Sequence, residues 1–352
     1  MPGAACKAPR RTGEAGSAVA AGCPAWRVAK WGIDMKALMS RLGGHLHEVV
    51  LAVLVLVALI VLSRQSANFL TVDNLLNQGR LIAEIGLVAL AMTFVIITGG
   101  IDLSVGSILG LVAVLLGAFW QNMGLPLPLA IVLAMIVGTV AGAINGLIIT
   151  RFKVPPLIAT LATLGLYRGL AEGISQARSV RGFPDWFYVL GQGDLFGVPV
   201  QLWVLALIVL LTAAVLSLTT WGRATYAMGS NETGARFSGL AVDRGKLAIY
   251  AFSGFCASLA AVIFVSRVST TRSDMGSGIE LDAITAVVLG GTSIFGGRGT
   301  IIGTALGLAL MQSLKSGLSL GGVKGDGTIV AIGVVLILTV LIGSIFRRDG
   351  HG

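Results

Sequence analysis

Ten long apolar stretches constrain this chain more than any other feature. An α-helix needs about 20 mostly apolar residues to cross the hydrocarbon core of a bilayer, and the sequence approaches that length repeatedly. We therefore expect an all-α polytopic membrane protein with about ten transmembrane helices. The predicted spans are residues 46–63, 81–98, 103–120, 127–150, 154–175, 199–219, 247–266, 280–296, 300–318 and 328–346.

The composition excludes a soluble domain. Hydrophobic residues make up 55% of the 352 residues and charged residues only 12%, whereas charged residues are about 25% of a typical soluble protein. The formal net charge is +9, but residues 1–47 hold seven Lys or Arg against Glu14 and Asp34. Such an excess is typical of a cytoplasmic tail beside anionic lipid, so we expect no nucleic-acid partner. Three cysteines without a paired spacing predict neither a disulfide framework nor a metal site.

The transmembrane domain is expected over residues 48–346, between a cytoplasmic tail at 1–47 and a short cytoplasmic tail at 347–352. Residues 1–34 lack apolar periodicity, which predicts disorder. Met35 begins a stretch that looks like a natural start. Residues 1–34 are therefore either part of the tail or an upstream extension of the reading frame.

An even number of spans puts both termini on one side of the membrane. The basic N-terminal tail favours the cytoplasm for that side, which also places the polar loop over residues 221–246 there. Outside the tail, Lys and Arg divide almost evenly between the two sides. The predicted orientation in a bacterial inner membrane therefore depends chiefly on the tail.

Glycine is frequent, with 49 residues, and it recurs at intervals of four. In lipid, faces of glycine let helix backbones approach closely, so we expect a tightly packed bundle. Double G-x-x-x-G motifs occur in the fourth and ninth predicted spans, at Gly138, Gly142, Gly146, Gly299, Gly303 and Gly307. A further resemblance links residues 99–111 with 276–291, in oppositely directed spans, as in the inverted repeats of transporters.

Several polar side chains fall inside or at the edge of apolar spans. A charge there costs at least a few kcal/mol, so such groups normally face the bundle interior, water or a partner. Arg168 and Glu172 lie four residues apart on one helix face, and they either pair structurally or line a solute path. The candidates for lining a translocation path are Asp102, Ser104, Asn145, Arg168, Glu172, Glu280, Asp282 and Thr292.

The stretch "TGGIDLS" at 98–104 predicts a broken helix. Gly99 and Gly100 permit the break, and Asp102 or Ser104 can cap the helix that follows. Alternatively, the unwound segment exposes polar groups toward a hydroxylated solute, since irregular backbone at membrane depth is tolerated where it lines protein or a cavity.

The polar loop at 221–246 predicts a short water-facing helix over residues 231–239. Ser230 or Asn231 can cap its start, Glu232 suits the N-terminal dipole, and Gly239 can end it. Gly234 and Ala235 keep one face shallow, and Phe237 and Leu240 offer apolar anchors. A helix of this kind either inserts into a groove on another protein or merely connects two spans.

The residues from about 68 to 346 resemble the permease subunits of bacterial ATP-binding-cassette importers of the ribose, xylose, rhamnose and autoinducer-2 type. The resemblance rests on several stretches together, none of which is specific alone. They are "NFLTVDNLLN" at 68–77, "TGGIDLSVGS" at 98–107, "NGLIITRFKVPPLIATLATLGLYRGLA" at 145–171, "GFP" at 182–184, "WGRATYAMGSNETGARFSGL" at 221–240 and "ELDAITAVVLGGTSIFGGRGT" at 280–300.

This resemblance implies that residues 223–241 form a cytoplasmic coupling helix that contacts an ATPase subunit. It also implies a second permease copy, a periplasmic solute-binding protein and a small sugar as partners. Ser230 and Gly234 depart from the usual residues. The coupling candidates are Gly222, Arg223, Tyr226, Ala227, Gly229, Asn231, Glu232, Ala235, Ser238 and Gly239.

The chain lacks the means to hydrolyse ATP itself. No G-x-x-x-x-G-K-[ST] motif occurs, because Gly245 and Lys246 are followed by Leu247. We expect a non-catalytic subunit without a cofactor, with ATP used by the partner. The alternatives are a permease for branched amino acids or nucleosides and an ion-coupled carrier using Glu84, Asp102 or Glu172.

Overall fold

The computed structural model describes residues 46–323, 325, 327–328, 330–334 and 337. The predicted tails and most of the tenth predicted span lie outside these residues. The helices are α2 (Leu46–Gln65), α3 (Val72–Ile97), α4 (Val105–Gly117), the π-helical turn η1 (Ala118–Asn122), α5 (Leu127–Arg151), α6 (Pro156–Ser175), α7 (Asp185–Gln192), α8 (Val200–Leu218), α9 (Thr220–Ser230), α10 (Glu232–Phe237), α11 (Val242–Val268), α12 (Ile279–Leu289) and α13 (Ile301–Leu320).

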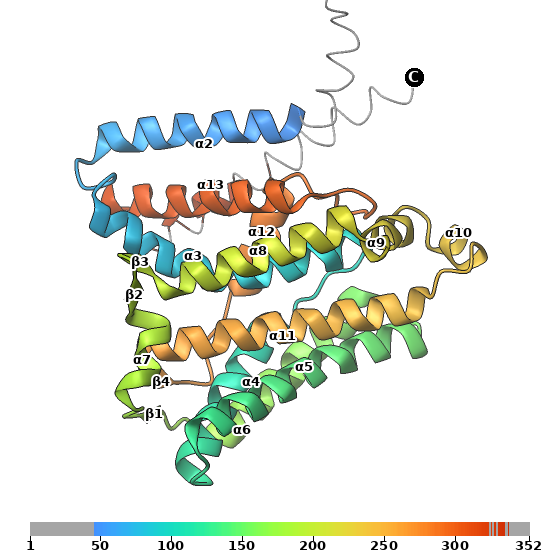
Figure 1. Ribbon diagram of the computed structural model, residues 1–352, viewed down its shortest axis with the longest axis horizontal. Helices are drawn as coiled ribbons and strands as arrows, with labels where there is room; N and C mark the ends of the chain where they lie inside the picture. The colour runs from blue at the N-terminus through green and yellow to red at the C-terminus, as the bar shows by residue number, and fades with distance from the viewer. Residues whose placement is uncertain (1–45, 324, 326, 329, 335–336, 338–352) are drawn as a thin grey trace, which may run out of the picture. The chain divides into compact units, whose positions relative to one another are not determined.

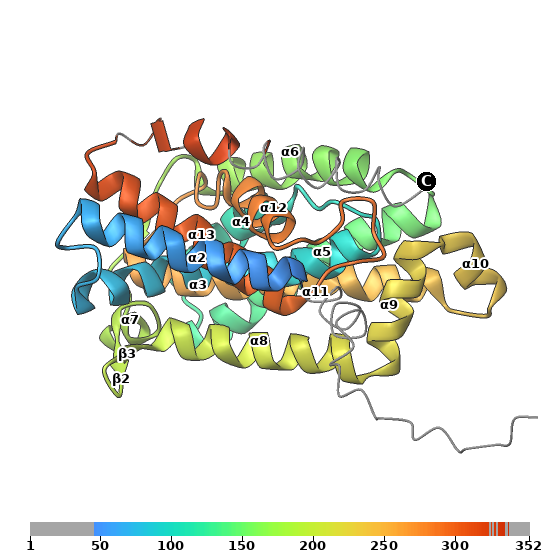
Figure 2. The same ribbon diagram turned by 90° about the horizontal axis from the view of Figure 1, so that it is seen from above.

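The long helices lie side by side with their axes roughly aligned (Figures 1 and 2). At one end, α9 and α10 project from the bundle; we call this the α10 end. At the other, the α7 end, α7 lies beside two short antiparallel strand pairs. These are β1 (Val180–Arg181) with β4 (Thr270–Thr271), and β2 (Asp194–Leu195) with β3 (Val198–Pro199).

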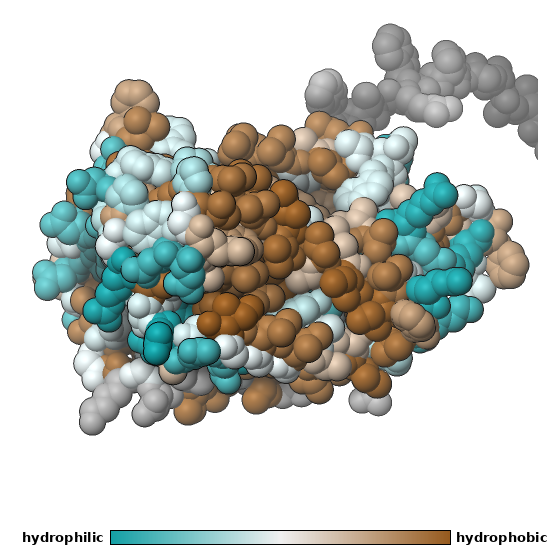
Figure 3. Space-filling model, turned by 90° about the horizontal axis from the view of Figure 1, so that it is seen from below, coloured by the Kyte–Doolittle hydropathy of each residue, from teal (hydrophilic) through white to brown (hydrophobic). Residues whose placement is uncertain are grey.

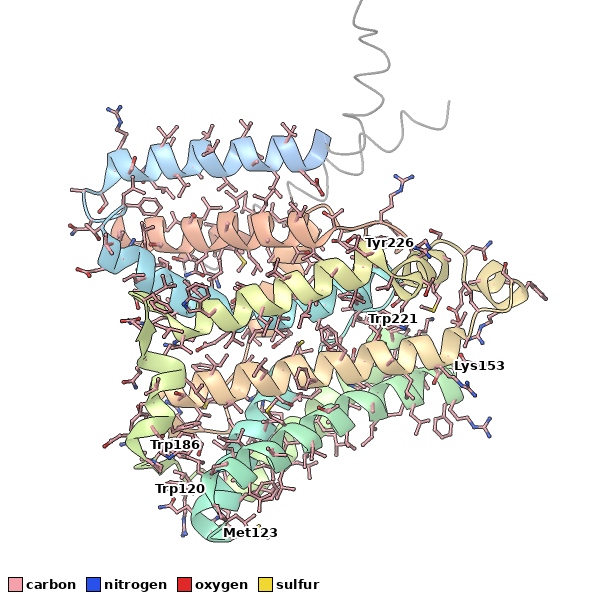
Figure 4. All side chains as sticks on the ribbon, viewed as in Figure 1. Trp120, Met123, Lys153, Trp186, Trp221 and Tyr226 are labelled. Atoms are coloured by element: carbon pink, nitrogen blue, oxygen red, sulfur yellow. The ribbon has the colours of Figure 1, made fainter. Side chains whose placement is uncertain are left out.

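The surface has the pattern of a membrane protein. Figure 3 shows an apolar band across the middle of one face and polar residues toward both ends. Aromatic side chains gather near the two ends, where Trp221 and Tyr226 lie at the α10 end and Trp120 and Trp186 at the α7 end (Figure 4). Trp and Tyr favour the two membrane interfaces.

Seven helices among the described residues are long and apolar enough to cross a membrane: α2, α3, α4 with η1, α5, α8, α11 and α13. The predicted all-α polytopic class is therefore confirmed. The fifth predicted span is α6, which has the length but carries Arg168 and Glu172. The eighth predicted span, 280–296, is helical only as α12, whose 11 residues extend about 16 Å and cannot cross the bilayer core alone.

Close backbone contacts explain the predicted glycine motifs. On α5, a Cβ on Gly142 would overlap the carbonyl oxygen of Tyr250 and lie 2.8 Å from the nitrogen of Gly254 on α11. On α13, a Cβ on Gly303 or Gly307 would overlap the backbone of α12. Gly142, Gly303 and Gly307 thus lie at helix-packing surfaces, as dispersion-driven association in lipid requires. Gly299, predicted to share the face of Gly303, lies instead in the irregular segment before α13.

The two sequence stretches that resemble each other fold in opposite directions. Residues 98–104 are irregular and lead into α4, which runs toward the α7 end, where Gly117 meets Thr271 and Val180. Residues 272–278 lead into α12, which runs toward the α10 end and packs at Gly290 against Gly303. The first turn of α4 meets the start of α12, since a Cβ on Gly106 would overlap Gly276 and Glu280.

Candidate functional site

A buried polar cluster holds the break between α3 and α4. Asp102 Oδ1 accepts hydrogen bonds from the Ser104 amide at 3.0 Å and the Ser104 hydroxyl at 2.6 Å. Asp102 Oδ2 accepts from the Ser253 hydroxyl of α11 at 2.8 Å, and Asn145 Nδ2 of α5 donates to Ser104 Oγ at 2.7 Å. All four side chains are fully buried. The cluster therefore ties the irregular segment to two long helices.

The irregular segment between α3 and α4 agrees in part with the roles predicted for its glycines and its capping residues. Gly99 adopts φ +76°, a left-handed conformation that suits glycine. Ser104 is the N-cap of α4 by position, but its hydroxyl makes no capping bond and turns toward Asp102 instead. Thr160 of α6 donates to the carbonyl oxygen of Ile101 at 3.0 Å, which satisfies a backbone group of the break. Three helices thus hold this segment by side-chain hydrogen bonds.

Arg168 and Glu280 lie beside the same face of the first turns of α4, at Gly110 and Gly106. The Arg168 guanidinium donates to the carbonyl oxygens of Ser273 and Met275, the latter at 3.1 Å, and to that of Gly106 at 3.4 Å. Glu280 Oε1 accepts from the Gly278 amide at 3.1 Å, while its buried Oε2 has no hydrogen-bond partner within the described residues. Arg168 thus supports the backbone at the meeting point of α4 and the segment before α12.

The other path candidates lie apart from this region. Glu172 is exposed on α6, and within the described residues no ion pair joins it to Arg168. Asp282 pairs with Lys315 of α13 at 2.6 Å. Thr292 is buried in the irregular segment after α12, and in the described part of the chain its hydroxyl has no hydrogen-bond partner. The eight candidates therefore do not form one site, and only Asp102, Ser104 and Asn145 are hydrogen-bonded together.

The predicted short helix over residues 231–239 is present as α10. Asn231 is its N-cap and accepts from the Gly234 amide at 2.8 Å. Gly239 follows its end at φ +82°, and the amides of Gly239 and Leu240 return to the carbonyls of Arg236 and Ala235 at 3.0 and 3.1 Å. This pair of bonds is a Schellman ending. The helix therefore starts and stops on the residues that the sequence indicates.

Ion pairs hold α10 against the start of α11. Glu232 bonds Arg236 at 3.0 Å and Lys246 at 2.6 Å, and Arg236 also bonds Asp243 at 2.5 Å. Partial burial alone would raise the pKa of Glu232, but the hydrogen bonds from Lys246 and Arg236 outweigh it and keep the pKa below its ordinary value. The carboxylate is thus ionised and bridges two basic side chains.

Most of the coupling candidates contact their own chain. Tyr226 donates its hydroxyl to the Gly299 carbonyl at 2.7 Å, and a Cβ on Gly229 would overlap the Ile97 carbonyl oxygen. Gly222 packs against the end of α8, and Ala235 is a buried residue of α10. Ala227 is half-buried and its carbonyl accepts the Asn231 amide. The exposed candidates are Arg223, Asn231, Ser238 and Gly239.

Sequence reasoning offered Phe237 as an apolar anchor of the short helix, but it missed two residues of the bundle, Ser253 and Arg267. Phe237, at the end of α10, is 89% exposed. Ser253 completes the Asp102 cluster, and Arg267 pairs with the buried Glu84 at 2.7 Å. No motif identifies Ser253 or Arg267, whereas Phe237 follows from its place in the predicted water-facing helix.

The described residues contain no group of three or more His, Cys, Asp or Glu side chains that could hold a metal ion. The buried cluster has one carboxylate with neutral hydroxyl and amide donors. Its arrangement suits fixing a helix break within the bundle.

Comparison with known proteins identifies relatives of this chain. A family model described as branched-chain amino acid transport system / permease component matches residues 74–344. The chain is 40% identical over 312 residues to a ribose import permease protein of Bacillus subtilis, covering 88% of this chain and 94% of that protein. It is 38% identical over 296 residues to a ribose import permease protein of Escherichia coli K12, covering 83% and 91%.

A third relative is an autoinducer 2 import system permease protein of Escherichia coli K12 strain DH10B. It is 37% identical over 300 residues, which are 84% of this chain and 91% of that protein. No solved structure matches the chain.

Proposed function

The chain belongs to the family of transport-system permease components, and on that premise we propose that it forms the membrane path of an ATP-binding-cassette importer for a monosaccharide or similar polyhydroxylated solute. The observation that carries the solute class is the identity of 37–40% to ribose and autoinducer 2 import permeases over more than four fifths of the chain. As a permease component it is a non-catalytic subunit, and separate ATPase subunits supply the energy.

The proposed crossings number ten. They are the seven long apolar helices, α6, the segment over 270–300 that contains α12, and residues 328–346. An even number leaves both termini on the α10 end, which we place in the cytoplasm of a bacterial inner membrane. The basic tail over residues 1–47 supports this orientation through the positive-inside rule.

The ATPase contact is proposed at α10. This helix stands clear of the bundle (Figure 1), is held by ion pairs to α11, and presents Phe237 to solvent. Exposing a large apolar side chain to water is unfavourable. A groove on a partner protein that covers the side chain removes this cost. Movement of the ATPase subunits would then reach the bundle through α9, whose Trp221 and Tyr226 contact Phe94 and Gly299.

A second permease copy is proposed against α6. Gly165, Gly169 and Gly173 share one face of this helix, with open space beside each, and Glu172 is exposed on the same helix. A carboxylate at membrane depth does not favour lipid, and exposed glycine backbone suits another helix. We infer that the solute path lies between the two copies, with a periplasmic solute-binding protein at the α7 end.

The experiment compares two matched substitutions. Phe237→Ala and Phe196→Ala each remove an aromatic ring that is 89% exposed, at opposite ends of the bundle. Co-purification with the ATPase and ATP-driven uptake of D-ribose are measured in proteoliposomes with the binding protein. Phe237→Ala is expected to weaken ATPase association about tenfold or more, corresponding to about 1.4 kcal/mol, with little change from Phe196→Ala.

Equal association of both variants would contradict the assignment of α10. Competition by L-leucine against D-ribose tests the solute class, because the family description names branched-chain amino acid transport. Uptake of L-leucine in place of D-ribose would favour the amino-acid alternative.

A further inference from the structure

A cavity of about 790 Å³ opens between α3, α11, α12 and α13 near the α7 end. This volume lies within the about 300–1,000 Å³ of small-molecule sites. Its rim carries the ion pair of Arg272 and Asp274, whose side chains are 57% and 60% exposed. The cavity therefore opens toward the polar end of the bundle, and it belongs to one copy of the chain, apart from the outward face of α6.

Charges in and beside the cavity are matched. Asp282 pairs with Lys315 at 2.6 Å and Asp274 with Arg272 at 2.5 Å. Glu84, which also lines the cavity, pairs with Arg267 at 2.7 Å. A cation site needs a carboxylate without a basic partner, and an anion site needs an unpaired base. Since each acid already has a base, the electrostatics favour a neutral ligand.

The walls nevertheless keep spare hydrogen-bonding capacity. The Lys315 ammonium has three donors, and one hydrogen bond, to Asp282 Oδ2, is formed in the structure. Gln312 donates to Gln78 and retains its carbonyl oxygen as an acceptor. Thr270 lines the cavity, and its buried hydroxyl has no hydrogen-bond partner among the residues that the structure describes. Donors and acceptors from separate helices thus converge on one space.

One wall is apolar. Phe264, Ile85 and Val268 line the cavity beside the polar groups. A sugar ring combines hydroxyl edges with faces of C–H groups, so it requires both kinds of wall. A purely apolar ligand would leave these polar groups without hydrogen-bond partners, which is unfavourable.

We propose that this cavity is a binding site for a neutral polyhydroxylated solute within each copy of the chain. The inference rests on the proposed import function and adds a site that precedes the path between copies. Lys315, Asp282 and Gln312 would bond hydroxyl groups, and Phe264 would cover a C–H face.

The first test fills the cavity from its rim. Ser319 lines the cavity and is exposed, so Ser319→Trp adds a large side chain without replacing a buried group. Leu210→Trp on α8, where Leu210 is 69% exposed, is the matched control. Uptake of D-ribose by the assembled transporter is expected to fall about tenfold or more in Ser319→Trp alone. Normal uptake by Ser319→Trp would overturn the inference.

The second test needs no transport. A variant with Cys6→Ser, Cys23→Ser and Ser319→Cys leaves Cys256 as its other thiol, and Cys256 is fully buried. The purified chain in nanodiscs reacts with a methanethiosulfonate reagent, with D-ribose, L-leucine or sodium chloride added. Slower reaction with D-ribose alone supports the site, whereas equal rates, or protection by L-leucine alone, overturn it. If the transporter without these substitutions shows no ATP-driven uptake of D-ribose, the proposed function is refuted separately, because the labelling experiment does not depend on ATP.

Discussion

Ser253 on α11 donates its hydroxyl hydrogen bond to Asp102 Oδ2 at 2.8 Å, across 151 positions of sequence. This contact joins the irregular segment before α4 to the longest described helix. Both side chains are fully buried, so the carboxylate depends on a small set of neutral donors. The break between α3 and α4 is therefore fixed by tertiary contacts in addition to its glycines.

Replacing Asp102 by Asn is expected to weaken this attachment. The amide puts a donor where an oxygen now accepts from hydroxyl or amide groups, and a buried unsatisfied group costs about 1–3 kcal/mol. We expect a lower midpoint of thermal unfolding in detergent and impaired uptake, with ATPase assembly retained. Asp185→Asn, at an exposed position on α7, is the control. Unchanged uptake would mean that Asp102 is a replaceable structural group.

Gly229 and Gly239 should differ sharply, although both are coupling candidates. A Cβ on Gly229 would overlap the Ile97 carbonyl oxygen and lie 2.6 Å from the Gly297 nitrogen, so Gly229→Val should disrupt packing of α9 on the bundle. Gly239 has open space but φ +82°, so Gly239→Ala should strain the α10 ending by about 1–2 kcal/mol and leave the bundle intact.

Membrane expression and monodispersity in detergent measure the first effect, and ATPase co-purification measures the second. A well-folded Gly229→Val variant that lacks only ATPase binding would contradict this packing argument.

The sequence located α10 well because capping is local. Asn231, Glu232 and Gly239 act on backbone groups within a few residues, and those interactions follow from residue type and spacing. Whether Tyr226 or Gly229 contacts a partner or the same chain depends on where α3 and the segment near Gly299 fold. Sequence spacing carries no information on that placement, so the family resemblance grouped packing residues with exposed ones.

The long helices of the bundle were also predictable from the sequence, whereas the irregular segment after α12 was not. Apolar length identifies α3, α5 and α11 because a spanning helix must be long. Residues 290–300 are rich in glycine and small residues but form an irregular segment beside Gly229 and Ile97. Composition does not distinguish that segment from a helix when protein surrounds it, which is why α12 is shorter than expected.

Removing the base beside Glu84 should destabilise the bundle strongly. The Glu84 side chain is 5% exposed and accepts from Arg267 at 2.7 and 3.1 Å. Arg267→Met leaves a buried carboxylate unpaired, which costs about 3–5 kcal/mol. Adding Glu84→Gln should recover most of the loss, because it removes the unpaired charge. A double-mutant cycle on thermal stability checks this, and simple additivity would contradict the pairing.

Acidification should loosen α10. The pKa of Glu232 lies below its ordinary value of 4.5, so its stabilising effect is present above pH 4.5 and is lost as the pH falls through the lower value of the folded protein. Its side chain is 41% exposed, so solvent screening keeps the effect below about 1 kcal/mol.

A nitroxide on Ser238→Cys, with Cys6 and Cys23 replaced by Ser, should become more mobile below pH 4.5. Asp243 also bonds Arg236 and titrates in the acidic range, so Glu232→Gln isolates the contribution of Glu232. That variant should be more mobile than the parent at pH 7. Identical mobility of the two at pH 7 would show that the bridge to Lys246 does not hold α10.

A bulky residue on the open face of α6 should separate two copies of the chain without harming either. Gly169 has no atom within 4 Å of a built Cβ, so Gly169→Ile creates no clash inside the copy, yet it would block close approach of a second helix. Crosslinking through Ala162→Cys, exposed on the same helix, should yield dimers in membranes and lose most of them with Gly169→Ile. Ala206→Ile, at an exposed position of α8, should have no such effect. Because each copy keeps its own packing, the midpoint of thermal unfolding in detergent should stay the same in all three variants. Equal crosslinking with and without Gly169→Ile would place the second copy elsewhere.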